Sequence, residues 1–181
     1  MWKPKYSKPG LIAGKNIYRS EDFLFFWRHI GARESCLSQW YPTPFTVDGI
    51  CYNCAEQYMM AMKAAIFGDE KIREEIMASY DPMVIKKLGR RVGNFDPHVW
   101  DEKSHEVVRT ANLAKFSQNQ KLKDFLLGTG DRILVEASPY DRIWGIGLDA
   151  DSPQATMPSR WPGENRLGFI LMEVRDILRG R

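Results

Sequence analysis

The stretch AEQYMMAMKAAIF, residues 55–67, is almost wholly apolar but carries an acid, Glu56, an amide, Gln57, and an amine, Lys63. At about 100° per residue, a helix places Glu56 and Lys63 nearly on one line, two turns apart, with apolar side chains around them. Burial of a carboxylate and an amine shifts their pKa values, so this helix face is a candidate for chemistry. Two structural alternatives remain open: a buried ion pair, or an acid that simply occupies the favourable first turn of its helix.

Length and charge limit the class of protein. The chain has 181 residues, 44% of them hydrophobic, which predicts one compact domain, expected over residues 11–181. Residues 1–10 hold three lysines and two prolines and are expected to form a flexible basic arm. The 26 basic and 23 acidic residues balance too closely to indicate a nucleic-acid partner, although a ligand with phosphate groups is allowed.

The three cysteines indicate neither a disulfide framework nor a metal site. Cys36, Cys51 and Cys54 are an odd number, and no secretory signal or membrane-spanning apolar run is visible. Cys51 and Cys54 have the spacing of half a zinc site, but no second pair completes it and the three histidines lack ligand spacing. We therefore expect a soluble cytoplasmic protein with no metal and no cofactor, whose cysteines fill the core.

Turn and capping residues divide the chain into elements. The aromatic run of residues 22–27 predicts a buried strand, and an Asp-Gly pair at 48–49 predicts a hairpin over residues 46–51. Asp-Pro pairs at 81–82 and 96–97 each supply an N-cap carboxylate and a proline at the first helical position, so two helices should begin there. Periodicity predicts further helices at 120–127 and 165–178 and short strands at 133–137 and 143–147. The result is an α+β fold, a helix-dominated domain with a small mixed β-sheet.

Polar and aromatic residues gather where regular structure is weakest. Residues 136–147 pass from one predicted strand to the next, with Trp144 as a flat stacking face and two glycines that let a ligand approach. Residues 161–168 place a glycine turn and backbone donors at a helix start, where a phosphate or a ribose hydroxyl binds readily. The basic cluster at 87–91 either satisfies carbonyls at a helix end or contacts phosphates. Each segment also has an ordinary structural explanation as a capped turn, a core tryptophan or a helix end.

Several familiar catalytic motifs are absent from the sequence. No GxGxxG, P-loop, GxSxG or HExxH occurs, so dinucleotide-fold redox chemistry, kinase-type transfer, serine hydrolysis and zinc proteolysis lack their usual sequence support. Aromatic residues make up 12% of the chain, with six tryptophans, which favours a pocket for a planar ligand.

A set of short motifs runs in unbroken order through about residues 35–178. They are LSQWYP at 37–42, DG at 48–49, AEQY at 55–58, KA at 63–64, LGR at 88–90, AKFSQN at 114–119, LVEAS at 134–138, WG at 144–145 and LG at 167–168. In this order the chain resembles the NADAR family, also called the YbiA-like or swarming-motility type. Each motif is short, but their sequence along most of the chain makes the resemblance specific.

The resemblance implies a YbiA-like α+β fold and an N-glycosidase, a hydrolase that cleaves the bond between ribose C1′ and a nitrogen. Two substrate classes are associated with the family: ADP-ribose on guanine bases, including guanine in nucleic acid, and phosphoribosylamino-pyrimidine intermediates of riboflavin biosynthesis. Breaking such a bond passes through an oxocarbenium-like state that needs a nearby negative group and a proton donor for the leaving nitrogen. A non-catalytic module that binds NAD or ADP-ribose is the alternative.

The resemblance also suggests roles for particular residues. Glu56 would stabilise the cation or activate water, and Lys63 would capture the opened sugar as a Schiff base or contact a phosphate or hydroxyl. Asp141 is the third predicted catalytic residue, as the acid, and Glu136 is a second candidate for that role. The predicted substrate-binding residues are Trp40, Tyr52, Gln57, Arg90, Lys115, Glu136, Trp144, Gly145, Gly147 and Asn165.

One position departs from the family pattern. Some riboflavin-linked members carry an acid between the two glycines of the Trp-Gly-x-Gly motif, where this chain has Ile146. The riboflavin substrate therefore does not transfer directly from the resemblance. Asp149 and Asp151 follow closely, and they either replace the missing acid or belong to a solvated loop.

Overall fold

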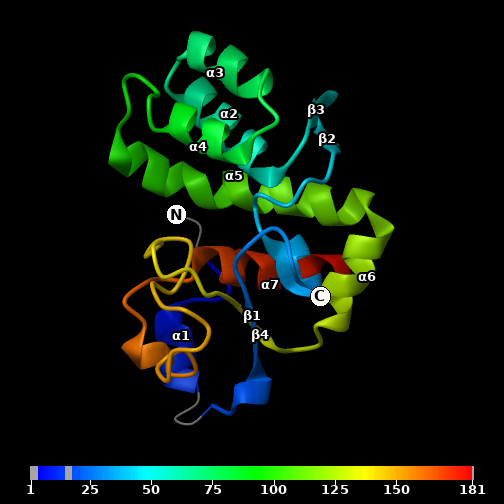
Figure 1. The fold of residues 1–181 in the computed structure, drawn as a ribbon, viewed down its shortest axis with the longest axis vertical. Helices are drawn as coiled ribbons and strands as arrows, with labels where there is room; N and C mark the ends of the chain where they lie inside the picture. The colour runs from blue at the N-terminus through cyan, green and yellow to red at the C-terminus, as the bar shows by residue number, and fades with distance from the viewer. Residues whose placement is uncertain (1–3, 15–17, 181) are drawn as a thin grey trace. The chain divides into compact units, whose positions relative to one another are not determined.

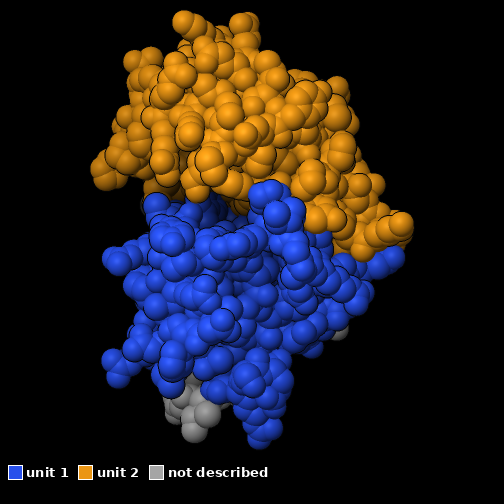
Figure 2. Space-filling view, viewed as in Figure 1, with its two compact units in different colours: residues 1–38, 123–181 blue, residues 39–122 orange. Residues whose placement is uncertain are grey.

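The computed structural model describes residues 4–14 and 18–180. Its contacts divide the chain into two compact units, coloured separately in Figure 2: unit 1 comprises residues 1–38 and 123–181, and unit 2 comprises residues 39–122. Helices dominate, so the predicted helix-rich α+β class is confirmed. The described strands form two separate two-stranded sheets, one parallel and one antiparallel, instead of the single mixed sheet expected from the sequence. None of the helices within the described ranges is long and apolar enough to cross a membrane.

Unit 2 is built around helix α2, Ala55–Ile66. Helix α2 packs against α3 (Glu70–Met77), α4 (Pro82–Gly89) and α5 (Pro97–Gln118), as Figure 1 shows. The hairpin of β2 (Phe45–Val47) and β3 (Ile50–Tyr52) leads into it. Because three helices surround α2, eight of its twelve residues are buried, which explains why it is apolar on almost every side.

The predicted turn and helix starts of unit 2 are confirmed. Asp48 and Gly49 both have positive φ values, 50° and 78°, as a two-residue type I′ hairpin turn requires. Asp81 and Asp96 each accept hydrogen bonds from two backbone N–H groups in the first turn of α4 and α5, and a proline follows each of them.

Unit 1 is organised around a parallel pair of strands. Strand β1 (Phe23–Phe26) lies beside β4 (Ile133–Glu136), with Phe23 opposite Ile133 and Phe26 opposite Glu136. Helix α7 (Arg166–Leu178) packs on β4 and buries ten of its residues (Figure 1). The remaining elements are α1 (Lys8–Gly14), α6 (Gln120–Gly128), which begins in unit 2, and short 3-10 helices at Ser20–Asp22, Arg33–Leu37 and Pro158–Arg160.

The strand predicted for residues 143–147 is wrong, because these residues form a loop. Their carbonyl groups accept hydrogen bonds from N–H groups at the start of α7, for example Ile146 from Gly163 (2.8 Å) and Trp144 from Leu167 (3.1 Å). Carbonyls used in this way by a helix entrance are not available for a strand ladder.

The N-terminal segment also differs from the flexible arm predicted for residues 1–10. Lys5 donates its backbone N–H to Glu173 (3.0 Å), and the side chains of Lys5 and Tyr6 both donate to Asp176 on α7. Helix α1 begins at Lys8, within the predicted arm. Buried carboxylates on α7 require partners, and the segment supplies them; residues 1–3 lie outside the described residues.

We expect Asp176→Asn to weaken this attachment in a pH-dependent way. Burial by itself would raise the pKa of Asp176, but the hydrogen bonds from Lys5 and Tyr6 outweigh it and hold that pKa below its usual value. A carboxyl group whose pKa is lowered by folding stabilises the folded state at pH values above its unfolded-state pKa of about 3.9. This stabilisation is lost as the pH falls through the pKa of the folded state. Urea unfolding should show a loss of about 1 kcal/mol at pH 7 that shrinks below pH 3.

The matched control is Asp131→Asn, which removes an exposed carboxylate that pairs with Arg179. Its cost should stay under about 0.5 kcal/mol at both pH values. Equal effects of the two substitutions would contradict a specific attachment through Asp176.

Candidate functional site

We call four of the buried polar side chains of unit 2 the polar cluster, namely Gln39, Glu56, Asn112 and Lys115. Each is at most 8% exposed. The backbone N–H of Glu56 donates to the carbonyl of Gln39 (3.0 Å), and Nδ2 of Asn112 donates to Oε1 of Gln39 (2.8 Å). The charges of Glu56 and Lys115 both act on the thiol of Cys54, the residue before α2. A buried carboxylate and a buried ammonium thus both lie in the neighbourhood of Cys54, at the start of α2.

Cys54 itself is not suited to metal binding. Burial raises the pKa of the Cys54 thiol to about 11. A hydrogen bond from the backbone of Gln57 and the charge of Lys115 lower this pKa, and the charge of Glu56 raises it further, but burial is the largest cause. The thiol is therefore protonated near pH 7, whereas a metal ligand is a thiolate. Across residues 4–14 and 18–180, no three His, Cys, Asp or Glu side chains are grouped closely enough to hold a metal ion.

Lys63 lies about 10 Å further along the axis of α2 than Glu56, because seven residues separate them. Its Nζ donates to the carbonyl of Gly89 at the end of α4 (2.7 Å) and lies 4.1 Å from the ring centroid of Phe95 and 5.9 Å from that of Trp100. Burial lowers the pKa of Lys63, which enlarges its neutral, nucleophilic fraction. The described structure pairs Lys63 with no carboxylate, so the buried Glu56–Lys63 ion pair that the sequence left open is not formed.

Gln57, predicted to bind substrate, uses its amide inside the protein. Its Oε1 accepts from the backbone N–H of Asn53 (2.8 Å), and its Nε2 donates to the carbonyls of Ile76 (3.1 Å) and Ser79 (3.0 Å). Gln57 therefore ties the start of α2 to the end of α3.

The other predicted binding residues of unit 2 differ in exposure. Tyr52 is 3% exposed and packs edge-on against Tyr58, with 4.9 Å between ring centroids, and burial raises its pKa. Trp40 is half-buried, with the ammonium of Lys86 5.6 Å from its ring centroid. Arg90 is exposed at the C-cap of α4. Trp40 and Arg90 are accessible to a ligand, and Tyr52 belongs to the core.

In unit 1, Asp141 caps the loop that contains the Trp-Gly-x-Gly motif. Its Oδ1 accepts from the backbone N–H groups of Ile143 (2.9 Å) and Trp144 (2.8 Å). Gly145 is required sterically, because a Cβ there would lie 2.8 Å from the carbonyl oxygen of Glu136, and Gly147 has a φ of 71°. These contacts give the predicted acid and the two glycines a structural role in shaping the loop.

Asn165 fastens this loop and α7 to strand β4. It is fully buried with a φ of 58°; its Oδ1 accepts from the N–H of Glu136 (3.0 Å) and its Nδ2 donates to the carbonyl of Leu134 (2.9 Å). The Asn165 side chain thus makes the two hydrogen bonds that a neighbouring strand would make at this edge of β4. Both groups that the sequence assigned to a ligand are used by the backbone.

The phosphate site suggested by the donors of residues 161–168 is not formed. The N–H groups of residues 163–167 all donate to carbonyls of residues 142–146. Backbone donors that are already paired cannot cradle an anion without breaking the loop.

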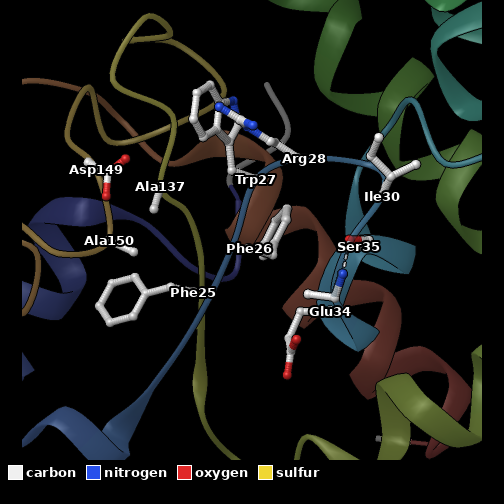
Figure 3. Close-up of a pocket in the computed structure, with 11 residues that line it drawn as sticks. Phe25, Phe26, Trp27, Arg28, Ile30, Glu34, Ser35, Ala137, Asp149 and Ala150 are labelled. Atoms are coloured by element: carbon white, nitrogen blue, oxygen red, sulfur yellow. Dashed lines mark hydrogen bonds between the residues drawn. The ribbon is translucent and has the colours of Figure 1, made fainter.

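A pocket of about 300 Å³ in unit 1 lies where the two parallel strands end. Its walls come from residues 25–28 at the end of β1, from Glu34 and Ser35, and from Ala137, Asp149 and Ala150, as Figure 3 shows. Open sheets of parallel strands bind ligands outside the carboxyl ends of the strands, and this pocket has that position.

Trp27 and Arg28 line this pocket but were not among the site residues predicted from the sequence. The available signal was an aromatic residue and a cation directly after an aromatic strand. This pattern did not predict a site, because a single sequence does not show that β1 pairs with β4, more than a hundred residues later. Asp149, considered as a replacement acid, does line the pocket.

The elements described above define a helix-rich α+β protein with two small sheets. The solved NMR structure of the Escherichia coli protein YbiA superposes with a TM-score of 0.71 and 31% identity, over 90% of this chain and 88% of that one. Residues 25–179 match the sequence profile of the NADAR domain. The chain belongs to the NADAR domain family.

Relatives in this family carry names that state an activity. The chain is 46% identical over 144 residues to an N-glycosidase of Acanthamoeba polyphaga mimivirus, which covers 77% of this chain and 85% of that protein. It is 37% identical over 135 residues to N-glycosidase YbiA of Escherichia coli, covering 75% and 76%. A riboflavin biosynthesis protein of Vibrio vulnificus is 35% identical over 143 residues, which span 79% of this chain but 35% of that protein.

We predict that Asn165→Ala destabilises the fold by about 3 kcal/mol, because it leaves a buried N–H and a buried carbonyl of β4 without partners. The control is Asn94→Ala, since Asn94 also has a positive φ (52°) but is exposed, and its cost should be about 1 kcal/mol. Urea unfolding of both variants measures the difference. A cost for Asn165→Ala no larger than that of the control would show that its hydrogen bonds to β4 are unimportant.

Proposed function

We propose that this protein is an N-glycosidase that hydrolyses a bond between ribose C1′ and a nitrogen, with Glu56 as the carboxylate that acts at C1′. The observation that carries the proposal is the burial of Glu56 in the polar cluster, in a chain whose family relatives are named N-glycosidases. A buried acid is costly unless its charge is used or paired, and the backbone of Glu56 is hydrogen-bonded to Gln39, whose side chain accepts from the amide of Asn112.

The chemistry of the bond explains the choice of Glu56. As the C1′–N bond breaks, positive charge develops at C1′ and the ring oxygen, and a carboxylate in a poorly solvated site stabilises it strongly. Glu56 either contacts this cation or takes a proton from the water whose oxygen bonds to C1′, while the leaving nitrogen gains a proton. On this proposal, Lys115 balances the charge of the carboxylate or contacts a phosphate of the substrate.

The substrate belongs, on this proposal, to one of two classes: ADP-ribose linked to guanine, free or in nucleic acid, or a phosphoribosylamino-pyrimidine of riboflavin biosynthesis. The name of the Vibrio vulnificus relative supports the second class. Against it, Ile146 stands where some riboflavin-linked members carry an acid, and its side chain is fully buried. Both classes should therefore be tested side by side.

We expect Glu56→Gln to lower the rate of base release by about 100- to 10,000-fold, the range for loss of a positioned acid–base group. Mass spectrometry of free ADP-ribose and of ribose 5-phosphate, from the two substrate classes, measures the rate. Glu70→Gln, an exposed acid at the start of α3, is the matched control and should retain full activity.

The same variant separates catalysis from mere binding. A non-catalytic module for NAD or ADP-ribose would release no product in the wild-type protein, and calorimetry would then give equal affinity for ADP-ribose with and without Glu56→Gln. Release of product by the wild type that persists in Glu56→Gln would instead assign the reaction to another residue.

A second route uses Lys63 as the nucleophile, and the lowered pKa of its half-buried amine favours this candidate. In that route the neutral Nζ bonds to C1′ as the C1′–N bond breaks, and the C1′–O4′ bond of the ring then opens to give an imine. The two amine protons pass to the leaving nitrogen and to O4′, and water later hydrolyses the imine to the free amine and the sugar. Borohydride in the presence of substrate should then trap an adduct on Lys63. Trapping should become faster as the pH rises toward the lowered pKa, because the neutral amine attacks.

Lys63→Arg is the control for this route, since arginine keeps the charge and a donor for the Gly89 carbonyl but does not form an imine. Loss of the adduct in Lys63→Arg supports the route. An adduct that maps to Lys115, or no adduct with an active enzyme, would reject Lys63 as the nucleophile.

A further inference from the structure

The start of helix α2 is held by a residue that lies outside the helix. The first N–H groups of an α-helix have no partner within it, and the N-cap residue of α2, Cys54, makes no side-chain hydrogen bond to them. The N–H of Glu56 donates instead to the backbone carbonyl of Gln39 (3.0 Å), which precedes the β2–β3 hairpin. The position of the Glu56 backbone therefore depends on where Gln39 lies.

The side chain of Gln39 is itself fixed by two helices that pack against each other, α2 and α5. Its Oε1 accepts from Nδ2 of Asn112 on α5 (2.8 Å), and its Nε2 donates to Sδ of Met59 on α2, a weak acceptor at 4.0 Å. Met59 follows Glu56 by three residues, so the two lie on neighbouring positions of the helix surface. Gln39 thus contacts α2 at two points and α5 at one.

Asn112 presents its amide to Gln39 in a single orientation. Asn112 is fully buried, and its Nδ2 donates both to Oε1 of Gln39 and to the carbonyl of Val108 on its own helix (2.9 Å). Each of the two Nδ2 hydrogens therefore has an acceptor. A flipped amide would turn Oδ1, which only accepts, toward two other acceptors, so the observed orientation is strongly preferred.

We propose that Asn112 and Gln39 are positioning residues for Glu56. Asn112 holds the side chain of Gln39, and the backbone carbonyl of Gln39 holds the N–H of Glu56 and so the point from which its carboxylate projects. This role rests on the proposed function, because it concerns the carboxylate that acts at C1′. A misplacement of a reacting group by about 1 Å costs up to about 100-fold in rate, so a small shift in the first turn of α2 has a large effect.

Hydrogen exchange of the Glu56 amide tests these contacts without any substrate. Asn112→Leu keeps a side chain of similar size but removes the donor to Gln39, and the Glu56 amide should then exchange about tenfold faster. The reference is the amide of Ile85, in the first turn of α4, which donates to the carbonyl of Asp81 (2.9 Å) and should change by less than about twofold. Equal acceleration of the two amides would overturn the proposal, because it would show a general loss of stability.

Steady-state kinetics tests the effect on the reaction. Asn112→Leu and Gln39→Leu break the same contact from its two sides, and each should lower kcat roughly 10- to 100-fold while KM changes by less than about threefold. The matched control is Val107→Ala, which shortens a buried apolar side chain of α5. It should lower the urea midpoint at least as much but change kcat by less than about twofold. The same loss of kcat in Val107→Ala would assign the effect to destabilisation and reject the positioning role.

Coupling to Glu56 separates positioning from a general structural role. In the Glu56→Gln background, Asn112→Leu should lower the residual rate by less than about twofold, because a positioning residue acts only through the group that it positions. If the two losses multiply in full, Asn112 does not act through Glu56 and the proposal is wrong.

Failure of this role differs from failure of the proposed function. A wild-type protein that releases no base rejects the N-glycosidase, and the positioning role with it, even where exchange at Glu56 confirms the contact with Gln39. A wild-type protein that releases base, slowed by Glu56→Gln but not by Asn112→Leu or Gln39→Leu, rejects the positioning role alone and keeps the activity.

Discussion

The burial of helix α2 is the constraint on which unit 2 depends. Three helices enclose it, and its tyrosine, methionines and alanines are removed from water together with a carboxylate and an amide. Each large apolar side chain buried in this way stabilises the fold by about 1.5–3 kcal/mol, which offsets the cost of enclosing polar groups. The enclosed polar groups are held by specific partners: Gln57 by backbone groups around α3, and Lys63 by the Gly89 carbonyl. A side chain such as Glu56 therefore has a defined position and a poorly solvated surrounding, the two properties that an acid acting on a glycosidic bond needs.

The pocket of unit 1 depends on backbone contacts between its strands, its loop and α7. Its two strands are short. Their geometry depends on Asn165, which bonds to the Leu134 carbonyl and the Glu136 N–H of β4, and on glycines that permit close backbone contact. The loop of residues 142–147 is in turn held by the start of α7. This framework leaves the carboxyl ends of β1 and β4 open, and the pocket with Trp27, Arg28 and Asp149 forms there. The residues of the Trp-Gly-x-Gly motif thus shape the unit, and its pocket is lined by residues outside that motif.

Local signals predicted most elements well. The hairpin turn at Asp48 and the helix starts at Asp81 and Asp96 follow from interactions within four residues, so the sequence contains all the information that they require. The strand at 143–147 was predicted wrongly because its apolar residues resemble a strand, whereas their carbonyls are used by residues twenty positions away. Gln57 and Asn165 show the same limit for the site: an amide suits a ligand and a backbone equally well, and only its neighbours distinguish the two.

The sequence by itself determined the helices α2 and α4 to α7, the helix-rich α+β class and the unusual composition of α2, since all of these reflect short-range preferences and hydrophobic periodicity. Motif order along the chain also indicated the NADAR family. Only the tertiary structure decided that Glu56 is buried with Gln39, Asn112 and Lys115, that Lys63 is bound by α4, and that β1 and β4 run side by side with a pocket at their ends. The physical reason is that burial, hydrogen-bond partners and pockets arise from contacts between residues far apart in the chain, which no local pattern encodes.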